Sequence, residues 1–113
     1  MIRHSKHFFA SLFFFCLVLL TYGQGSTTSS MSGKIIDEQD QPMAGATVVA
    51  THVPSGTVYG ATTNSQGLYS LDGMRPGGPY KVEISFVGYA KRTFTDITIL
   101  LGENSVLNTD LSQ

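Results

Sequence analysis

Apolar and polar side chains alternate most regularly between residues 80 and 86. The apolar positions are Tyr80, Val82, Ile84 and Phe86, and the polar positions between them are Lys81, Glu83 and Ser85. Successive side chains of a β-strand point to opposite faces, so this period of two predicts a strand with one buried face. It is the clearest structural signal in the chain and serves as the reference strand.

Two turn signals precede this strand. In the segment Asn64–Gly67, the asparagine can hydrogen-bond its own backbone two residues on, and Gly67 can adopt the positive φ that closes a tight turn. The run Pro76-Gly77-Gly78-Pro79 is expected to be a loop, because proline lacks a backbone donor and glycine gains little from being ordered.

Six further short runs have strand-like composition, and polar residues, glycine or proline separate them. They span residues 33–37, 46–53, 57–63, 68–71, 90–99 and 105–111, with a break expected in the 90–99 run near Asp96. No comparable stretch after residue 23 has the period of a helix. Seven short strands at this spacing predict an all-β fold, a two-sheet sandwich of the immunoglobulin-like kind.

The phase of each strand predicts which side chains form the core. The expected inward set is Ile35, Ala46, Val48, Ala50, Tyr69, Leu71, Tyr80, Val82, Ile84, Phe86, Ile97, Leu107 and Leu111. Burial of an aliphatic or aromatic side chain contributes roughly 1.5–3 kcal/mol, so a small domain depends on most of this set.

The N-terminus has the organisation of an export signal. Arg3 and Lys6 precede a nearly continuous apolar run, residues 8–20, and Thr21 and Gly23 then supply small residues at positions −3 and −1 of a cleavage site. That run is shorter than the roughly 20 residues that a membrane-spanning helix needs. We therefore expect a signal-peptide helix at 1–23, a flexible leader at 24–32 and one β-sandwich domain at 33–113. Cys16 lies inside the apolar run, not behind a lipoprotein-type cleavage site.

Removal of the signal changes the charge and the chemistry of the chain. Five basic and eight acidic side chains remain, a net charge of −3, and no cysteine remains. An acidic chain without a basic patch argues against a nucleic-acid partner. The absence of cysteine after residue 23 leaves no disulfide and no cysteine-based metal site in the mature chain.

The candidate catalytic and ligand-binding groups are few. His52 is the single histidine after residue 23, and no pattern in the sequence places Ser55 or Ser85 beside it as a nucleophile. The acidic turn at 37–40 lacks the oxygen spacing of a calcium loop, and the glycine-rich stretch 73–78 lacks the lysine and helix of a phosphate loop. We expect no enzyme activity, no catalytic or cofactor-binding residues, no metal site and no cofactor.

One constellation points to a covalent crosslink between strands. Lys34, Glu83 and Asn108 fall on the first, fifth and last predicted strands, where some secreted sandwich domains join a lysine to an asparagine beside a buried carboxylate. Each of the three alternates with inward apolar residues and should face solvent, where lysine stays charged and weakly nucleophilic. The phase therefore argues against the crosslink.

Several short motifs occur in an order that resembles a known family. They are Gly33-x-Ile35-x-Asp37, Pro42-x-x-Gly45-Ala46-x-Val48, Asn64-x-x-Gly67-x-Tyr69, and Pro79-Tyr80-x-Val82 followed by Gly88-Tyr89. The chain resembles the carboxypeptidase-regulatory-like domain, a transthyretin-like β-sandwich. From about Ser32 to Leu111 it is similar to the N-terminal extension of Oar-like TonB-dependent outer-membrane receptors of the Bacteroidetes type.

The resemblance implies a non-catalytic accessory domain on the periplasmic face of the outer membrane, before the plug and barrel of a transport receptor. Plug and barrel segments are not present in this sequence, so the receptor reading takes the chain as a truncated receptor or a fragment. Its partners would be the receptor's plug and barrel or periplasmic proteins. The resemblance assigns the motif glycines to backbone geometry and the motif tyrosines to packing.

A second hypothesis is an independent secreted binding or adhesive module, for glycan or for protein. Glycan sites usually expose aromatic platforms, and only Tyr59 and Phe94 are expected outside the core. For a protein partner, the last predicted strand, residues 105–111, has few charges that would block strand addition. Our hypothesis is that a partner strand docks at that edge.

Overall fold

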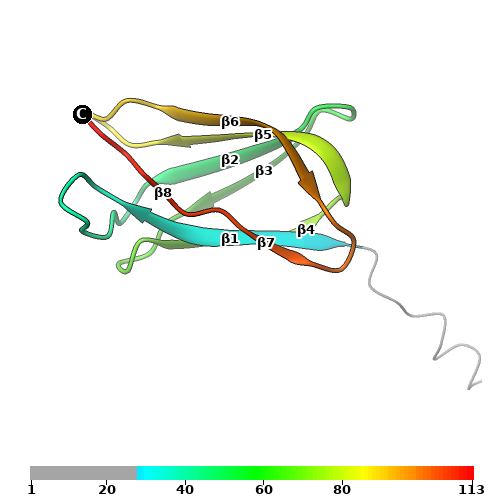
Figure 1. Ribbon diagram of the computed structural model, residues 1–113, viewed down its shortest axis with the longest axis horizontal. Coiled ribbons are helices and arrows are strands. Elements are labelled where there is room, and N and C mark those ends of the chain that lie inside the picture. Colours follow the sequence, from blue (N-terminus) through cyan, green and yellow to red (C-terminus); the bar gives the residue numbers. More distant parts are fainter. Residues whose placement is uncertain (1–27) are drawn as a thin grey trace, which may run out of the picture.

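The computed structural model describes residues 28–113, and these form an all-β sandwich (Figure 1). The eight strands are β1 (Ser29–Ile36), β2 (Thr47–His52), β3 (Thr57–Thr62), β4 (Leu68–Met74), β5 (Gly77–Ser85), β6 (Arg92–Ile99), β7 (Asn104–Val106) and β8 (Thr109–Asp110). The structure confirms the expected fold class, an all-β sandwich of two sheets. The predicted signal peptide and residues 24–27 lie outside the described residues. No helix that could cross a bilayer occurs within 28–113.

The strands divide between two sheets. One has the order β3-β2-β5-β6 and is antiparallel throughout. The other is built around β1, which pairs antiparallel with β4 and parallel with β7 and then β8. The start of β1 lies at one end of the sandwich and the C-terminus lies at the opposite end (Figure 1).

The first strand begins earlier than its composition suggests. β1 starts at Ser29, and both Ser29 and Met31 are buried, so the expected flexible leader is wrong for residues 29–32. The small serine fits at this position because its Oγ donates a hydrogen bond to the carbonyl of Leu100, 2.6 Å away. Residues 29–32 are three serines and one methionine, without the β-branched side chains that signal a strand.

The expected loop at 76–79 is also wrong, because β5 begins at Gly77. Proline is tolerated there because the pairing with β6 is irregular between Gly77 and Tyr80, while the Pro79 carbonyl still accepts a bond from the N–H of Val53. A Cβ on Gly78 would lie 2.6 Å from the carbonyl oxygen of Ile97, so the neighbouring strand can approach only a glycine.

Two further boundaries differ in detail. The predicted last strand is divided into β7 and β8, which raises the strand number from seven to eight. The expected break near Asp96 is a bulge inside a continuous β6, where Asp96 has a φ of 59° and the register with β5 shifts.

The core lies between the sheets and follows the predicted phase closely. Ten of the predicted inward side chains are fully buried, whereas Phe86, Ile97 and Leu107 are only partly buried against the core. The buried hydrophobic residues that the pattern did not identify are Met31, Met43, Met74 and Ile99. Three of these four are methionines, which fill irregular gaps without belonging to a regular alternation.

Candidate functional site

The end of the sandwich that carries the C-terminus brings together turns from both sheets. The backbone N–H of Ala90 donates to the carbonyl of Ser112, and the N–H of Gln113 donates to the Glu38 carboxylate. These bonds tie the turns at 37–41 and 86–91 to the last residues of the chain. We call the surface formed by residues 37–41, 86–91 and 108–113 the C-terminal end face.

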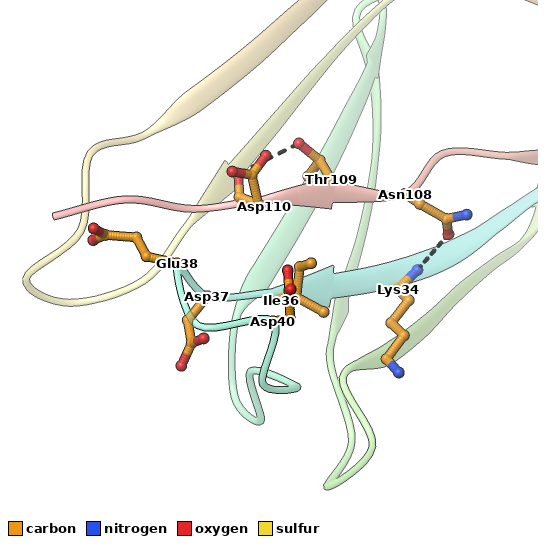
Figure 2. A pocket seen from close by; sticks show the side chains of 8 residues that line it. All are labelled: Lys34, Ile36, Asp37, Glu38, Asp40, Asn108, Thr109 and Asp110. Atoms are coloured by element: carbon orange, nitrogen blue, oxygen red, sulfur yellow. Dashed lines mark hydrogen bonds between the residues drawn. The ribbon is translucent and has the colours of Figure 1, made fainter.

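One side of this face is hollowed (Figure 2). The hollow has a volume of about 390 Å³ and is lined by Lys34, Ile36, Asp37, Glu38, Asp40, Asn108, Thr109 and Asp110. Four carboxylates and one ammonium group give the lining a local excess of negative charge. A surface of this sign attracts a basic segment of a partner more readily than an acidic one.

Most of the carboxylates here are already engaged in holding the fold. Asp37 Oδ1 accepts the backbone N–H groups of Gln39 and Gln41 at 2.8 and 3.0 Å. Asp110 accepts Arg92 Nη1 at 2.7 Å and thereby joins β8 to β6. Within the described part of the chain, no cluster of histidine, cysteine and carboxylate side chains could hold a metal ion.

The other side of this face is apolar. Val87, at the tip of the β5–β6 hairpin, is 94% exposed, more than any other large hydrophobic side chain among residues 28–113. The neighbouring rings of Phe86 and Tyr89 meet edge to face, with centroids 5.6 Å apart, and pack against the core. An exposed apolar tip on a packed base is typical of a protein contact.

The structure does not assemble the lysine–asparagine crosslink. Lys34 and Asn108 are neighbours, but the contact joins the backbone N–H of Lys34 to Asn108 Oδ1 at 2.8 Å, and the lysine side chain points away (Figure 2). Glu83 lies on β5 in the other sheet, between Lys81 and Lys91 at 2.8 and 3.2 Å. Hydrogen bonds from Lys81, then Lys91, lower the Glu83 pKa below its usual value.

His52 lies at the end of β2, as expected, and contacts a serine that the sequence did not assign to it. Its Nδ1 is 2.6 Å from Ser55 Oγ, which in turn lies 2.9 Å from Thr57 Oγ1. The hydrogen bonds of the described residues place no carboxylate on this imidazole. The pair therefore closes the β2–β3 hairpin and lacks the third group that orients a catalytic histidine.

The two aromatic side chains expected outside the core are not free platforms. Tyr59 is partly buried beside Tyr80, and its hydroxyl accepts the backbone N–H of Arg75 at 3.1 Å. Phe94 is partly buried, and the guanidinium of Arg92 lies 5.7 Å from its ring centroid. Glycan stacking needs an open ring face, so this geometry weighs against the glycan hypothesis.

The edge at residues 105–111 is less regular than a docking strand requires. Leu107 and Asn108 separate β7 from β8, and the Asn108 side chain accepts the hydrogen bond from the N–H of Lys34. A proline at position 108 would remove that acceptor, so an Asn108→Pro variant would disturb β1 as well as the edge.

Comparison with family models supplies the identity that the geometry leaves open. The model of the carboxypeptidase regulatory-like domain matches residues 30–112. The chain belongs to that family. No curated protein matches the chain. The family's motif glycines behave as their positions imply: Gly45, Gly67 and Gly88 all have positive φ.

Solved structures of low sequence identity share the fold of this carboxypeptidase regulatory-like domain. The TIE protein of Bacillus anthracis has a TM-score of 0.63 at 20% identity, over 77% of this chain and 17% of that one. A putative carbohydrate binding protein from Bacteroides uniformis has a TM-score of 0.59 at 17% identity, over 77% and 42%. A cohesin–X-dockerin complex from Acetivibrio cellulolyticus gives 0.58 at 22%, over 74% and 56%. The domain spans about half or less of these chains.

Proposed function

We propose that this carboxypeptidase regulatory-like domain is an exported, non-catalytic accessory module that works by protein contact through its C-terminal end face. The finding that carries the proposal is the family match over residues 30–112. The receptor setting, on the periplasmic side of a TonB-dependent outer-membrane receptor, comes from the resemblance of the motifs and is part of the proposal.

The arrangement of reactive side chains supports a contact role. His52 and Ser55 close a hairpin, and the Asp37, Glu38 and Asp110 carboxylates hold turns or strands. The groups left to meet a partner are the exposed Val87 side chain and the exposed Asp40 carboxylate of the hollow. A buried apolar anchor with a charged rim is the usual organisation of a protein interface.

Site-specific photo-crosslinking in cells tests this proposal. A photoreactive amino acid replaces Val87 at the C-terminal end face, and a matched variant carries it at Val53, an exposed valine in the β2–β3 hairpin at the opposite end. We expect the position-87 variant to crosslink to an outer-membrane barrel protein or its plug, identified by mass spectrometry, and the position-53 variant to give much less of that product.

Two outcomes would contradict the proposal. Equal crosslinking from both positions would remove the C-terminal end face as the contact surface. Recovery of the chain in the culture medium, without membrane-associated product, would favour an independent secreted module over the receptor setting. The intact mass of the exported chain, expected to begin at Gln24, checks the predicted signal cleavage in the same samples.

A further inference from the structure

Among the sheet edges, β3 is the one that lacks protection against pairing. β4 carries Asp72 and has a register shift opposite β1, and β6 carries Asp96 at a bulge. β7 and β8 are only 3 and 2 residues long. Charges, bulges and short length are the features by which edge strands avoid adding another strand. β3 has no charge, no proline and no register shift along its six pairs with β2.

The hydrogen-bonding phase shows which backbone groups of β3 are free. The N–H of Thr63 donates to the carbonyl of Ala46 across the β2–β3 ladder. Bonded and non-bonded pairs alternate along an antiparallel ladder, so the residues of β3 that face β2 are the odd-numbered ones. The N–H and C=O groups of Val58, Gly60 and Thr62 therefore point away from the sheet, and the hydrogen bonds of residues 28–113 give them no partner.

Neither the backbone conformation nor a close contact within the described domain requires a glycine at the centre of this edge. Gly60 does not have a positive φ, and the nearest atom to a Cβ built on it is the carbonyl oxygen of Val48 at 3.9 Å. Larger residues would fit, and glycine weakens a strand interior relative to them. One recognised cause of a strand glycine is the close approach of another backbone.

We propose that β3 is a self-association edge, at which a second copy of this chain pairs antiparallel about a two-fold axis at Gly60. Val58 of one copy then faces Thr62 of the other on the outer surface, and Tyr59 faces Ala61 on the inner surface. A large side chain opposite a small one, with no charge on either strand, satisfies the self-complementarity that a two-fold interface demands. The pairing joins two four-stranded sheets into one continuous sheet.

Amide hydrogen exchange measured by NMR across a concentration series tests the pairing directly. The amides of Tyr59, Ala61 and Thr63 should be protected at every concentration, because β2 holds them. Those of Val58, Gly60 and Thr62 should exchange fast in dilute samples and become protected as sedimentation velocity shows dimer. A single monomeric species with these three amides unprotected at the highest concentration would overturn the proposal, and protection by an unrelated extended peptide alone would assign the edge to a different partner.

Two charge variants test the register. In the Val58→Lys/Thr62→Lys variant, lysines face each other twice across the two-fold axis, and self-association should weaken about tenfold. In the Val58→Lys/Thr62→Glu variant, each lysine faces a glutamate, and association should match or exceed that of the parent. The partners of these positions within the chain are Thr51 and Thr47, so neither variant places like charges opposite each other in the monomer. Equal weakening of both folded variants would overturn the proposed register.

Discussion

The two sheets of this sandwich are held together in different ways. In the β3-β2-β5-β6 sheet, β2 pairs with β3 and with β5 over six consecutive residue pairs each, so the backbone ladder itself specifies the arrangement. The strand pairings of the sheet around β1 are shorter and include both antiparallel and parallel ones. Side-chain hydrogen bonds supplement the backbone pairing of this sheet. Asn108 Oδ1 accepts the N–H of Lys34, and the Tyr69 hydroxyl donates to the carbonyl of Leu107 at 2.7 Å.

This difference shows where each sheet is sensitive to substitution. A regular ladder tolerates changes at exposed positions, because any residue supplies its N–H and C=O. A sheet completed by particular contacts depends on the residues that make them.

The largest difference is expected at two strand glycines. A Cβ on Gly33, in β1, would lie 1.9 Å from the carbonyl oxygen of Leu107 and 2.9 Å from the Tyr69 ring. Both strands would have to move apart, so Gly33→Ala should destabilise the domain by about 4 kcal/mol or more. Urea unfolding followed by circular dichroism measures the change.

Gly60→Ala in β3 is the matched control. Its added methyl group meets nothing closer than 3.9 Å, and loss of a flexible glycine from the unfolded chain stabilises by about 0.4–1 kcal/mol. Similar destabilisation by the two substitutions would refute the contrast between the sheets.

The same contrast explains what could be predicted from the sequence. In the regular sheet β5 alternates apolar and polar residues, and β2 and β3 contain β-branched residues between turn signals. The predicted ranges 46–53, 57–63 and 80–86 lie within a few residues of β2, β3 and β5. In the other sheet, Ser29 and Met31 carry no such signal, although both are buried. The contact between Gly33 and Leu107 depends on tertiary packing, which no local pattern encodes.

The candidate surface was predictable only in part. The acidic turn at 37–40 is predicted from the sequence and belongs to this surface. The predicted turn at Asn64–Gly67 lies outside it and is confirmed: Asn64 Oδ1 accepts the N–H groups of Gln66 and Leu68, and Gly67 has a φ of 76°. The C-terminal end face was not predicted, because it forms only when residues 37–41, 86–91 and 108–113 meet. The exposure of Val87, beside the half-buried Phe86, also depends on where the strand ends.

The next largest effects concern the core side chains of each sheet. Ile84 in β5 and Met31 in β1 are 0% and 1% exposed, and replacing either with alanine should cost about 3 kcal/mol. Phe86→Ala should cost clearly less than Ile84→Ala, since Phe86 is only partly buried. Guanidinium titrations of the three variants give the ranking, and a Phe86→Ala cost equal to that of Ile84→Ala would contradict the observed burial.

Smaller effects are expected at two turns that connect the sheets with the same geometry. Asp37 Oδ1 accepts the N–H groups of residues 39 and 41, as Asn64 Oδ1 accepts those of residues 66 and 68. The Asn64 turn packs inside: a Cβ on Gly67 would lie 2.6 Å from the Ile35 carbonyl, whereas Asp40, at the equivalent position, is exposed with a φ of 63°.

Asn64→Ala should therefore cost about 1–2 kcal/mol, because two backbone donors lose their acceptor in a turn whose Gly67 packs against β1. Asp37→Ala should cost less, since the Asp40 end of its turn is exposed and can relax into water. Thermal unfolding of the two variants measures the difference, and a larger loss in Asp37→Ala would show that the acidic turn is the more important connection between the sheets.

The smallest predicted effect appears at alkaline pH and compares one tyrosine from each sheet. Burial raises the pKa of Tyr69, in β4, from 10.0 to about 12. The pKa of Tyr80, in β5, is also raised to about 12, mainly by burial and to a smaller extent by the nearby Tyr59. Since the folded pKa exceeds the unfolded one, the unfolded chain loses these protons first. The stability associated with each tyrosine is fully present below pH 10 and is lost as pH rises toward 12.

Between pH 10 and 11 each tyrosine should contribute a loss of about 1 kcal/mol to the free energy of unfolding. Tyr69→Phe removes the hydrogen bond to Leu107, at a cost of about 1 kcal/mol at neutral pH, but its stability should fall less steeply above pH 10. Tyr80→Phe, which loses the bond to the Arg75 carbonyl, should flatten the profile equally if both sheets exclude water to the same extent. If the unfolding free energy falls less steeply with pH in only one of the two variants, that variant identifies the tyrosine better shielded from water. An unchanged pH dependence in both would show that neither tyrosine governs alkaline unfolding.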